Sequence, residues 1–191
     1  MDNSVYYMLI AVAFFFLLQN GYSSITMTDI QKEGYSYKVR SKNPSHMNKA
    51  ADLLHKMKKK TEDLYNYLER HNYNAPEYKR LLQNQDVRFE EIQPHYQGEA
   101  AYSINKGEKI GICVYDKNKF MLDENTMFFV VLHELAHIMS TKYAHDEEFW
   151  TNFSKIIKVA IDAGLYRYQD YSKQEEKFCG HDITNNPYTP K

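Results

Sequence analysis

The chain has 191 residues and a formal net charge of −1, from 24 basic and 25 acidic side chains. This length accommodates one compact domain, and the balanced charge excludes a broad electrostatic attraction to nucleic acid or to an anionic membrane. Two cysteines, Cys113 and Cys179, exclude a disulfide framework, and free thiols are favoured over a single bridge between them. Any metal site therefore has to be built from His, Asp or Glu.

The N-terminus carries a charge-free apolar run, VYYMLIAVAFFFLL, at residues 5–18. Such a run predicts a retained membrane anchor over residues 1–21, with a cleaved signal peptide or a buried first helix as the alternatives. Four basic residues between positions 32 and 42 follow the run, and an acidic residue precedes it. The positive-inside rule therefore predicts a single-pass protein whose C-terminal domain lies in the cytosol.

Residues 22–44 are polar and have no sustained periodicity, which predicts a tether. Ser45 is then a plausible N-cap for a long amphipathic helix. The buried face of that helix is expected to hold residues that recur at spacings of three and four: Met47, Ala50, Leu54, Met57, Thr61, Leu64 and Leu68. The lysines on its other face are interpreted as a solvated surface and are given no function.

Residues 101–115, AYSINKGEKIGICVY, predict a β-hairpin with a turn at NKGE. Alternation of Ile110, Ile112 and Val114 gives the second strand one apolar face. Asp123 is then expected to cap a helix that begins near Glu124 and runs through MFFVVLHELAHIMS. Apolar residues surround this helix on nearly all sides, so it is predicted to be buried.

The buried helix contains HELAH, in which His133 and His137 are four residues apart and project from one face. Two imidazoles at this spacing can bind one zinc ion. Glu134 lies one position along, where it can act as the general base toward a water without being a ligand. The alternative is a pair of ordinary hydrogen-bonded histidines, but it has to place three ionisable groups in one buried segment without a metal.

A catalytic zinc site has three protein ligands and one open position. His145, in AHDEEFW, is the favoured third ligand, and Glu147, Glu148, Glu175, Glu176 and His181 remain open as rivals. Asp146 is expected to cap a final helix that ends at Gly164. Residues 166–191 are interpreted as a C-terminal tail.

The segments NKGEKIGICVY, VVLHELAHIMS and AHDEEFWTNF resemble the WLM-domain zinc metallopeptidases, relatives of the SprT and Spartan proteases, over roughly residues 50–166. The tail KFCGHDITNNP is similar to tails of compact WLM-like proteins of large DNA viruses. The resemblance implies an α+β, zincin-like domain at residues 45–165, with a long N-terminal helix, a small antiparallel sheet, the HExxH helix and a following helix. It also implies that His133, His137 and His145 bind Zn²⁺ and that Glu134 is the catalytic base.

The predicted function is a zinc-dependent endopeptidase that acts on a protein or peptide and is tethered to a membrane, cellular or virion-associated, through residues 5–18. Three alternatives remain: an inactive zinc-binding scaffold, a zinc hydrolase of a non-peptide bond, and a protease of DNA–protein crosslinks like cellular members of the family. The intact Glu134 favours an enzyme over a scaffold, because a scaffold has no use for a base. No strong nucleic-acid-binding signal is evident, which disfavours the crosslink alternative.

Overall fold

A computed structural model describes residues 26–40, 43–93 and 98–190. Within these ranges the helices are α2 (Pro44–Arg70), α3 (Pro76–Leu82), α4 (Glu124–Met139) and α5 (Glu147–Asp162). The strands are β1 (Thr28–Lys32), β2 (Tyr35–Val39), β3 (Arg88–Glu91), β4 (Ala101–Ile104), β5 (Lys109–Ile112), β6 (Glu176–Phe178) and β7 (His181–Ile183). The mixture of helices with a sheet confirms the α+β class.

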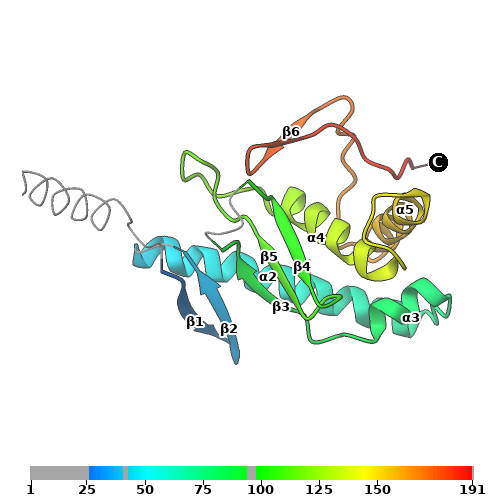
Figure 1. The fold of residues 1–191 in the computed structure, drawn as a ribbon, viewed down its shortest axis with the longest axis horizontal. Coiled ribbons are helices and arrows are strands. Elements are labelled where there is room, and N and C mark those ends of the chain that lie inside the picture. The colour runs from blue at the N-terminus through cyan, green and yellow to red at the C-terminus, as the bar shows by residue number, and fades with distance from the viewer. Residues whose placement is uncertain (1–25, 41–42, 94–97, 191) are drawn as a thin grey trace, which may run out of the picture.

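Five strands form one mixed sheet in the order β1-β2-β3-β5-β4, with antiparallel pairs at its two ends and parallel pairs between β2, β3 and β5. This sheet is larger than the small antiparallel one expected. Helix α2 runs along β1, β2 and β3, and α4 lies beside β4 and β5 (Figure 1). The edge strand β4 therefore borders the helix that carries HELAH.

The tether predicted for residues 22–44 is wrong over β1 and β2. These strands form a hairpin in which Thr28 lies opposite Val39, and the side chains of Tyr37 and Val39 are buried in the core with α2. The Tyr37 hydroxyl also forms a hydrogen bond of 2.9 Å with Nδ1 of His55 on α2. Polar residues occupy the exposed alternate positions of both strands. Their high proportion in such short strands makes the alternation of polar and apolar residues difficult to detect from the sequence.

The prediction of a single-pass membrane protein is corrected by the structure. In the described ranges no helix combines the length and the apolar character that crossing a bilayer requires. Helix α2 has 27 residues, but its lysines make it amphipathic and not apolar. The run at residues 5–18, on which the prediction depended, lies outside the described residues.

The predicted helices are present, with one change of cap. Asn43, and not Ser45, caps α2, and its side-chain oxygen accepts a hydrogen bond from the Ser45 amide at 2.9 Å. Asp123 caps α4 and Asp146 caps α5, as predicted. The short helix α3, which follows the turn at the end of α2, was not predicted from the sequence.

The hairpin of β4 and β5 is confirmed, with Ala101 opposite Ile112 and Ile104 opposite Lys109. Its turn packs directly on α4. Gly107 has a φ of +95°, and a Cβ at this position would lie 2.5 Å from Cδ1 of Ile138. Glycine therefore allows both the turn conformation and the close approach to the helix.

The expectation of free thiols is wrong. Cys113, directly after β5, forms a disulfide bond with Cys179, which lies between β6 and β7. These two residues come together because residues 166–190 fold back over the domain, where Tyr171 and Phe178 are buried in the core. Figure 1 shows the resulting β6–β7 hairpin above α4.

Candidate active site

Three histidines converge at one point on α4. Nε2 of His133 lies 3.2 Å from Nε2 of His137 and 3.1 Å from Nε2 of His145. The first two residues project from successive turns of α4, and His145 approaches from the loop that joins α4 to α5. In the described part of the chain, these three residues form the cluster of metal-ligating groups in which all ligand atoms lie within 4.8 Å of one another.

The cluster fits a zinc ion. Three nitrogens that each bind zinc at about 2.0–2.1 Å in tetrahedral geometry lie about 3.4 Å apart, close to the observed separations. In a neutral imidazole, one ring nitrogen carries the N–H donor and the other is an acceptor. When three such rings face one another through Nε2, the three nitrogens cannot all be matched as pairs of one donor and one acceptor. A cation that accepts three lone pairs removes this conflict.

A single aromatic ring supports all three imidazoles. The ring of Phe149, at the start of α5, is fully buried and lies with its centroid 4.9 Å from that of His133, 4.4 Å from that of His137 and 4.5 Å from that of His145. Its proximity to the cluster depends on how α5 packs on α4, which the apolar pattern does not specify.

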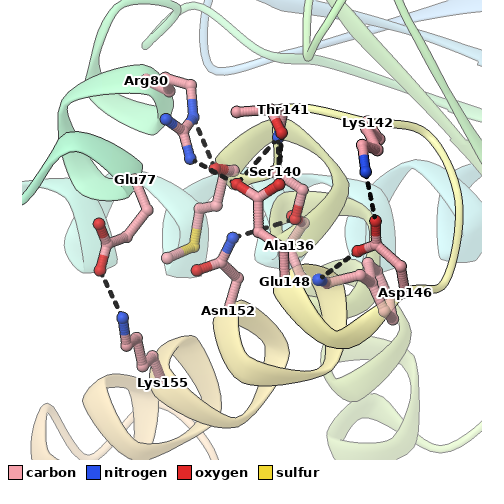
Figure 2. A network of polar contacts seen from close by, with 12 residues as sticks. Glu77, Arg80, Ala136, Ser140, Thr141, Lys142, Asp146, Glu148, Asn152 and Lys155 are labelled. Carbon is pink, nitrogen blue, oxygen red and sulfur yellow. Dashed lines mark hydrogen bonds and ion pairs between the residues drawn. The ribbon is translucent and has the colours of Figure 1, made fainter.

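A network of polar contacts holds the loop that carries His145 (Figure 2). Arg80, from α3, donates through Nε to the carbonyl of Met139 at 2.7 Å, at the C-terminal end of α4 where carbonyls lack helical partners. One of its two terminal guanidinium nitrogens donates to the Glu148 carboxylate at 3.0 Å. Glu148 accepts hydrogen bonds from the backbone amide and the hydroxyl of Thr141. Arg80 therefore connects both ends of the loop to α3.

The same loop is held from α5 as well. The Asn152 side chain donates to the Ser140 hydroxyl at 3.0 Å, and that hydroxyl donates to the carbonyl of Ala136. The carboxylate of Asp146 accepts a hydrogen bond from the Phe149 amide as the N-cap. The backbone on both sides of His145 is thereby fixed.

Glu134 is buried, with 6% of its surface exposed. Burial raises the pKa of its carboxyl to about 7; a hydrogen bond with Ser103 of β4 lowers it, and the nearby Glu99 raises it further. A pKa near neutrality suits a group that both accepts and donates a proton at physiological pH.

Burial also keeps the first two histidines neutral. It lowers the pKa of His133 to about 3 and that of His137 to about 4, and repulsion from the neighbouring imidazoles acts in the same direction. Neutral imidazole is the form that binds metal, so no proton has to leave these rings at neutral pH.

The rivals for the third ligand lie elsewhere. Glu148 is engaged by Arg80 and Thr141, and Glu176 lies in β6. His181 donates from Nε2 to the carbonyl of Gly98 at 2.6 Å. Among the candidate ligands in the described residues, only His145 joins the cluster on α4.

A cavity of about 390 Å³ opens beside His133 and Glu134. Residues from α4, α5, the β4 region and the C-terminal segment line it. From the C-terminal segment the sequence offered only His181 for the site, as a rival ligand, because the position of the other residues depends on the fold of the tail.

Comparison with known proteins identifies the family. A family model described as WLM domain matches residues 35–190. The chain belongs to the WLM domain family. This is a family of zinc-dependent metallopeptidases, so the resemblance found in the sequence is confirmed at this level. The match begins in β2 and reaches the tail, beyond residues 45–165 on both sides.

Viral proteins are similar to the chain. An uncharacterized protein, R325, of Acanthamoeba polyphaga mimivirus is 27% identical over 180 residues, which cover 91% of this chain and 90% of that protein. An uncharacterized protein, 042R, of invertebrate iridescent virus 3 is 39% identical over 67 residues, which cover 35% of this chain and 42% of that protein.

Among solved structures, a Wss1 mutant from Saccharomyces cerevisiae is similar to the chain. Its sequence is 22% identical, the alignment covers 67% of this chain and 92% of the Wss1 chain, and the TM-score is 0.48.

Proposed function

We propose that the protein is a zinc-dependent endopeptidase with a zincin-like core. The observation that carries the proposal is the convergence of metal-binding nitrogens from His133, His137 and His145, next to a cavity that His133 and Glu134 line. The proposed catalytic unit runs from β1 to the C-terminal segment, because both termini of the described chain contribute to the sheet or to the cavity.

The three histidines would hold the zinc ion beside the cavity that His133 and Glu134 line. A zinc ion in such a site supplies Lewis acidity to a carbonyl oxygen and acidifies water. The remaining steps belong to Glu134. Its carboxylate takes a proton from the attacking water and gives it to the nitrogen of the leaving amine as the peptide bond breaks.

The surroundings of Glu134 suit this exchange. Burial brings its pKa to about 7, and a cation held by the histidines would lower that value and favour the ionised base. The hydrogen bond with Ser103 orients the carboxyl toward β4. β4 is an edge strand of the described sheet, so an extended peptide can pair with its free side and lie across the cavity.

The test uses the full chain with Glu134→Gln and His145→Ala. Glu134→Gln is expected to keep bound zinc and to lose about 10²–10⁴-fold in the cleavage rate of an unfolded protein, because only the proton transfer is removed. His145→Ala is expected to lose zinc. His71→Ala, at an exposed histidine outside the cluster, is the matched control and is expected to retain both properties. Zinc content is measured by mass spectrometry and cleavage by gel.

Two outcomes contradict the proposal. Full cleavage by Glu134→Gln would show that Glu134 is not the catalytic base. Unchanged zinc affinity in His145→Ala would show that His145 is not the third ligand. A wild-type protein that binds zinc but cleaves no polypeptide would instead be a zinc-binding scaffold.

A further inference from the structure

The cavity beside Glu134 is largely apolar. Its apolar walls come from two helices and from the chain end: Phe129 and Val130 of α4, Trp150 and Phe153 of α5, and Ile183 and Pro187 of the C-terminal segment. Phe129 and Phe153 are buried, whereas Trp150 is 48% exposed and lies at the rim. A concave apolar surface with a few polar groups at its edge is typical of a site that binds a side chain or a small ligand.

The C-terminal wall, residues 181–187, is fixed at both ends. Before it, the disulfide bond of Cys179 and the hydrogen bond from His181 to the Gly98 carbonyl attach it to the sheet side of the cavity. At its far end Asn186 is buried and donates to the Tyr166 hydroxyl at 3.3 Å and to the Gln169 carbonyl at 3.0 Å. These contacts hold residues 181–187 in place as one wall of the cavity.

The charged side chains that line the cavity, apart from its histidines, are acidic. Its lining includes the carboxyl groups of Glu99, Glu134 and Asp182 and contains no lysine or arginine among the described residues. Asp182 has an ion pair with Lys177, a residue that is not part of the lining. Away from the proposed zinc ion, an acidic side chain entering this space would meet like charges, which is unfavourable.

We propose that the cavity receives an apolar side chain of the substrate next to the bond that is cut, and that residues 181–187 form the wall that limits its size. This inference rests on the proposed endopeptidase function. Side chains of an extended peptide paired with β4 alternate between the two faces of the strand. A side chain that points toward α4 enters the space between Val130 and Ile183, beside Glu134.

The first measurement identifies the preference. Full-length wild type is loaded with zinc and incubated with an unfolded protein, and the residues on each side of every cut are read by mass spectrometry. Peptides spanning the most frequent cut then carry Leu, Phe, Ala or Asp at the selected position. Leucine is expected to exceed alanine in kcat/KM by about tenfold or more, and aspartate is expected to be the poorest.

Two variants test the cavity walls. Val130→Phe narrows the space and is expected to reverse the preference toward alanine, whereas Ile183→Ala widens it from the opposite wall and is expected to favour phenylalanine over leucine. Ile161→Phe adds a ring at a partly buried position of α5 outside the cavity and is the control. If Val130→Phe does not fold, Ile183→Ala still tests whether the cavity walls set the preference, because this substitution only removes atoms and cannot cause a steric clash.

Binding without cleavage provides an independent readout. The chain has a single tryptophan, Trp150, at the rim of the cavity. In Glu134→Gln, tryptophan fluorescence is expected to report tighter binding of the leucine peptide than of the alanine peptide, again by about tenfold. Cleavage without preference for any flanking side chain, or a preference unchanged in both wall variants, would overturn the cavity assignment and leave the peptidase function standing. Leucine-dependent binding with no cleavage by wild type would overturn the function and support the cavity.

Discussion

Side-chain packing around His133 and His137 both brings the two rings together and keeps them neutral, as a metal site requires. The rings are packed against Phe149 and against one another, so water is largely excluded and the charged imidazolium is disfavoured. The same burial leaves Nε2 of each ring with the other imidazole nitrogen as a partner, at a distance of 3.2 Å. Nδ1 of His137 is also buried and has no hydrogen-bond partner among the described residues.

These two histidines predict a pH dependence of the metal-free protein. Their pKa values are about 3 and about 4 in the fold, against about 6.5 in the unfolded chain. Below pH 6.5 the unfolded chain binds protons that the folded protein does not. The free energy of unfolding should therefore fall as the pH drops from about 6.5 to about 4, by at most about 1.4 kcal/mol per pH unit for each histidine.

The measurement is urea unfolding of the zinc-free full chain at several pH values. The double variant His133→Gln/His137→Gln is expected to show a shallower dependence in this window. Equal slopes in wild type and variant would contradict the assignment of these two groups.

At the scale of elements, α3 is joined to the candidate site although it contributes no ligand. Arg80 satisfies the carbonyl of Met139 at the end of α4 and pairs with Glu148 at the start of α5. One side chain thus determines the separation of the two helices at the loop where His145 lies. The position of the third imidazole depends on this contact as much as on its own backbone.

Arg80→Met is therefore expected to weaken zinc binding by about tenfold, in the range found when groups that orient metal ligands are removed. Methionine keeps much of the aliphatic volume but cannot donate to Met139 or pair with Glu148. The control is Lys155→Met, which breaks the ion pair of 2.6 Å with Glu77 on the same face without touching the loop. Competition with a chromophoric chelator measures the affinity, and equal affinities of Arg80→Met and wild type would refute the role of this contact.

The elements that could be predicted from the sequence are those whose signals are local. Asp123 and Asp146 cap α4 and α5, and His133 and His137 share a helix face because they are four residues apart. The position of β1 and β2 could not be predicted, since their apolar face is completed only by α2. The contact of Phe149 with all three imidazoles also depends on helix packing, which periodicity leaves undetermined.

At the scale of the molecule, the disulfide bond joins residues 66 apart in sequence and connects the sheet to the C-terminal segment. The sequence contains no local pattern that pairs Cys113 with Cys179, because their proximity results from the whole tail folding back. For the same reason, the wall that residues 181–187 add to the cavity could not be predicted.

Replacing both cysteines, Cys113→Ser and Cys179→Ser, is expected to lower the free energy of unfolding by about 4 kcal/mol, the value for a closed loop of this length in the chain-entropy account. Urea unfolding of the full chain is the measurement. Wild type unfolded in a reducing agent should match the double variant, and equal stability of oxidised wild type and double variant would contradict a bond that closes this loop.

The bond between Cys113 and Cys179 also makes a covalent ring that contains His133, Glu134, His137 and His145. Residues 141–144, inside this ring, are exposed. If a protease, or a second copy of this enzyme, cuts the chain there, the two fragments remain linked through sulfur. Such a nicked molecule gains the mass of one water and keeps both halves of the histidine cluster, and it separates into two polypeptides only when it is reduced.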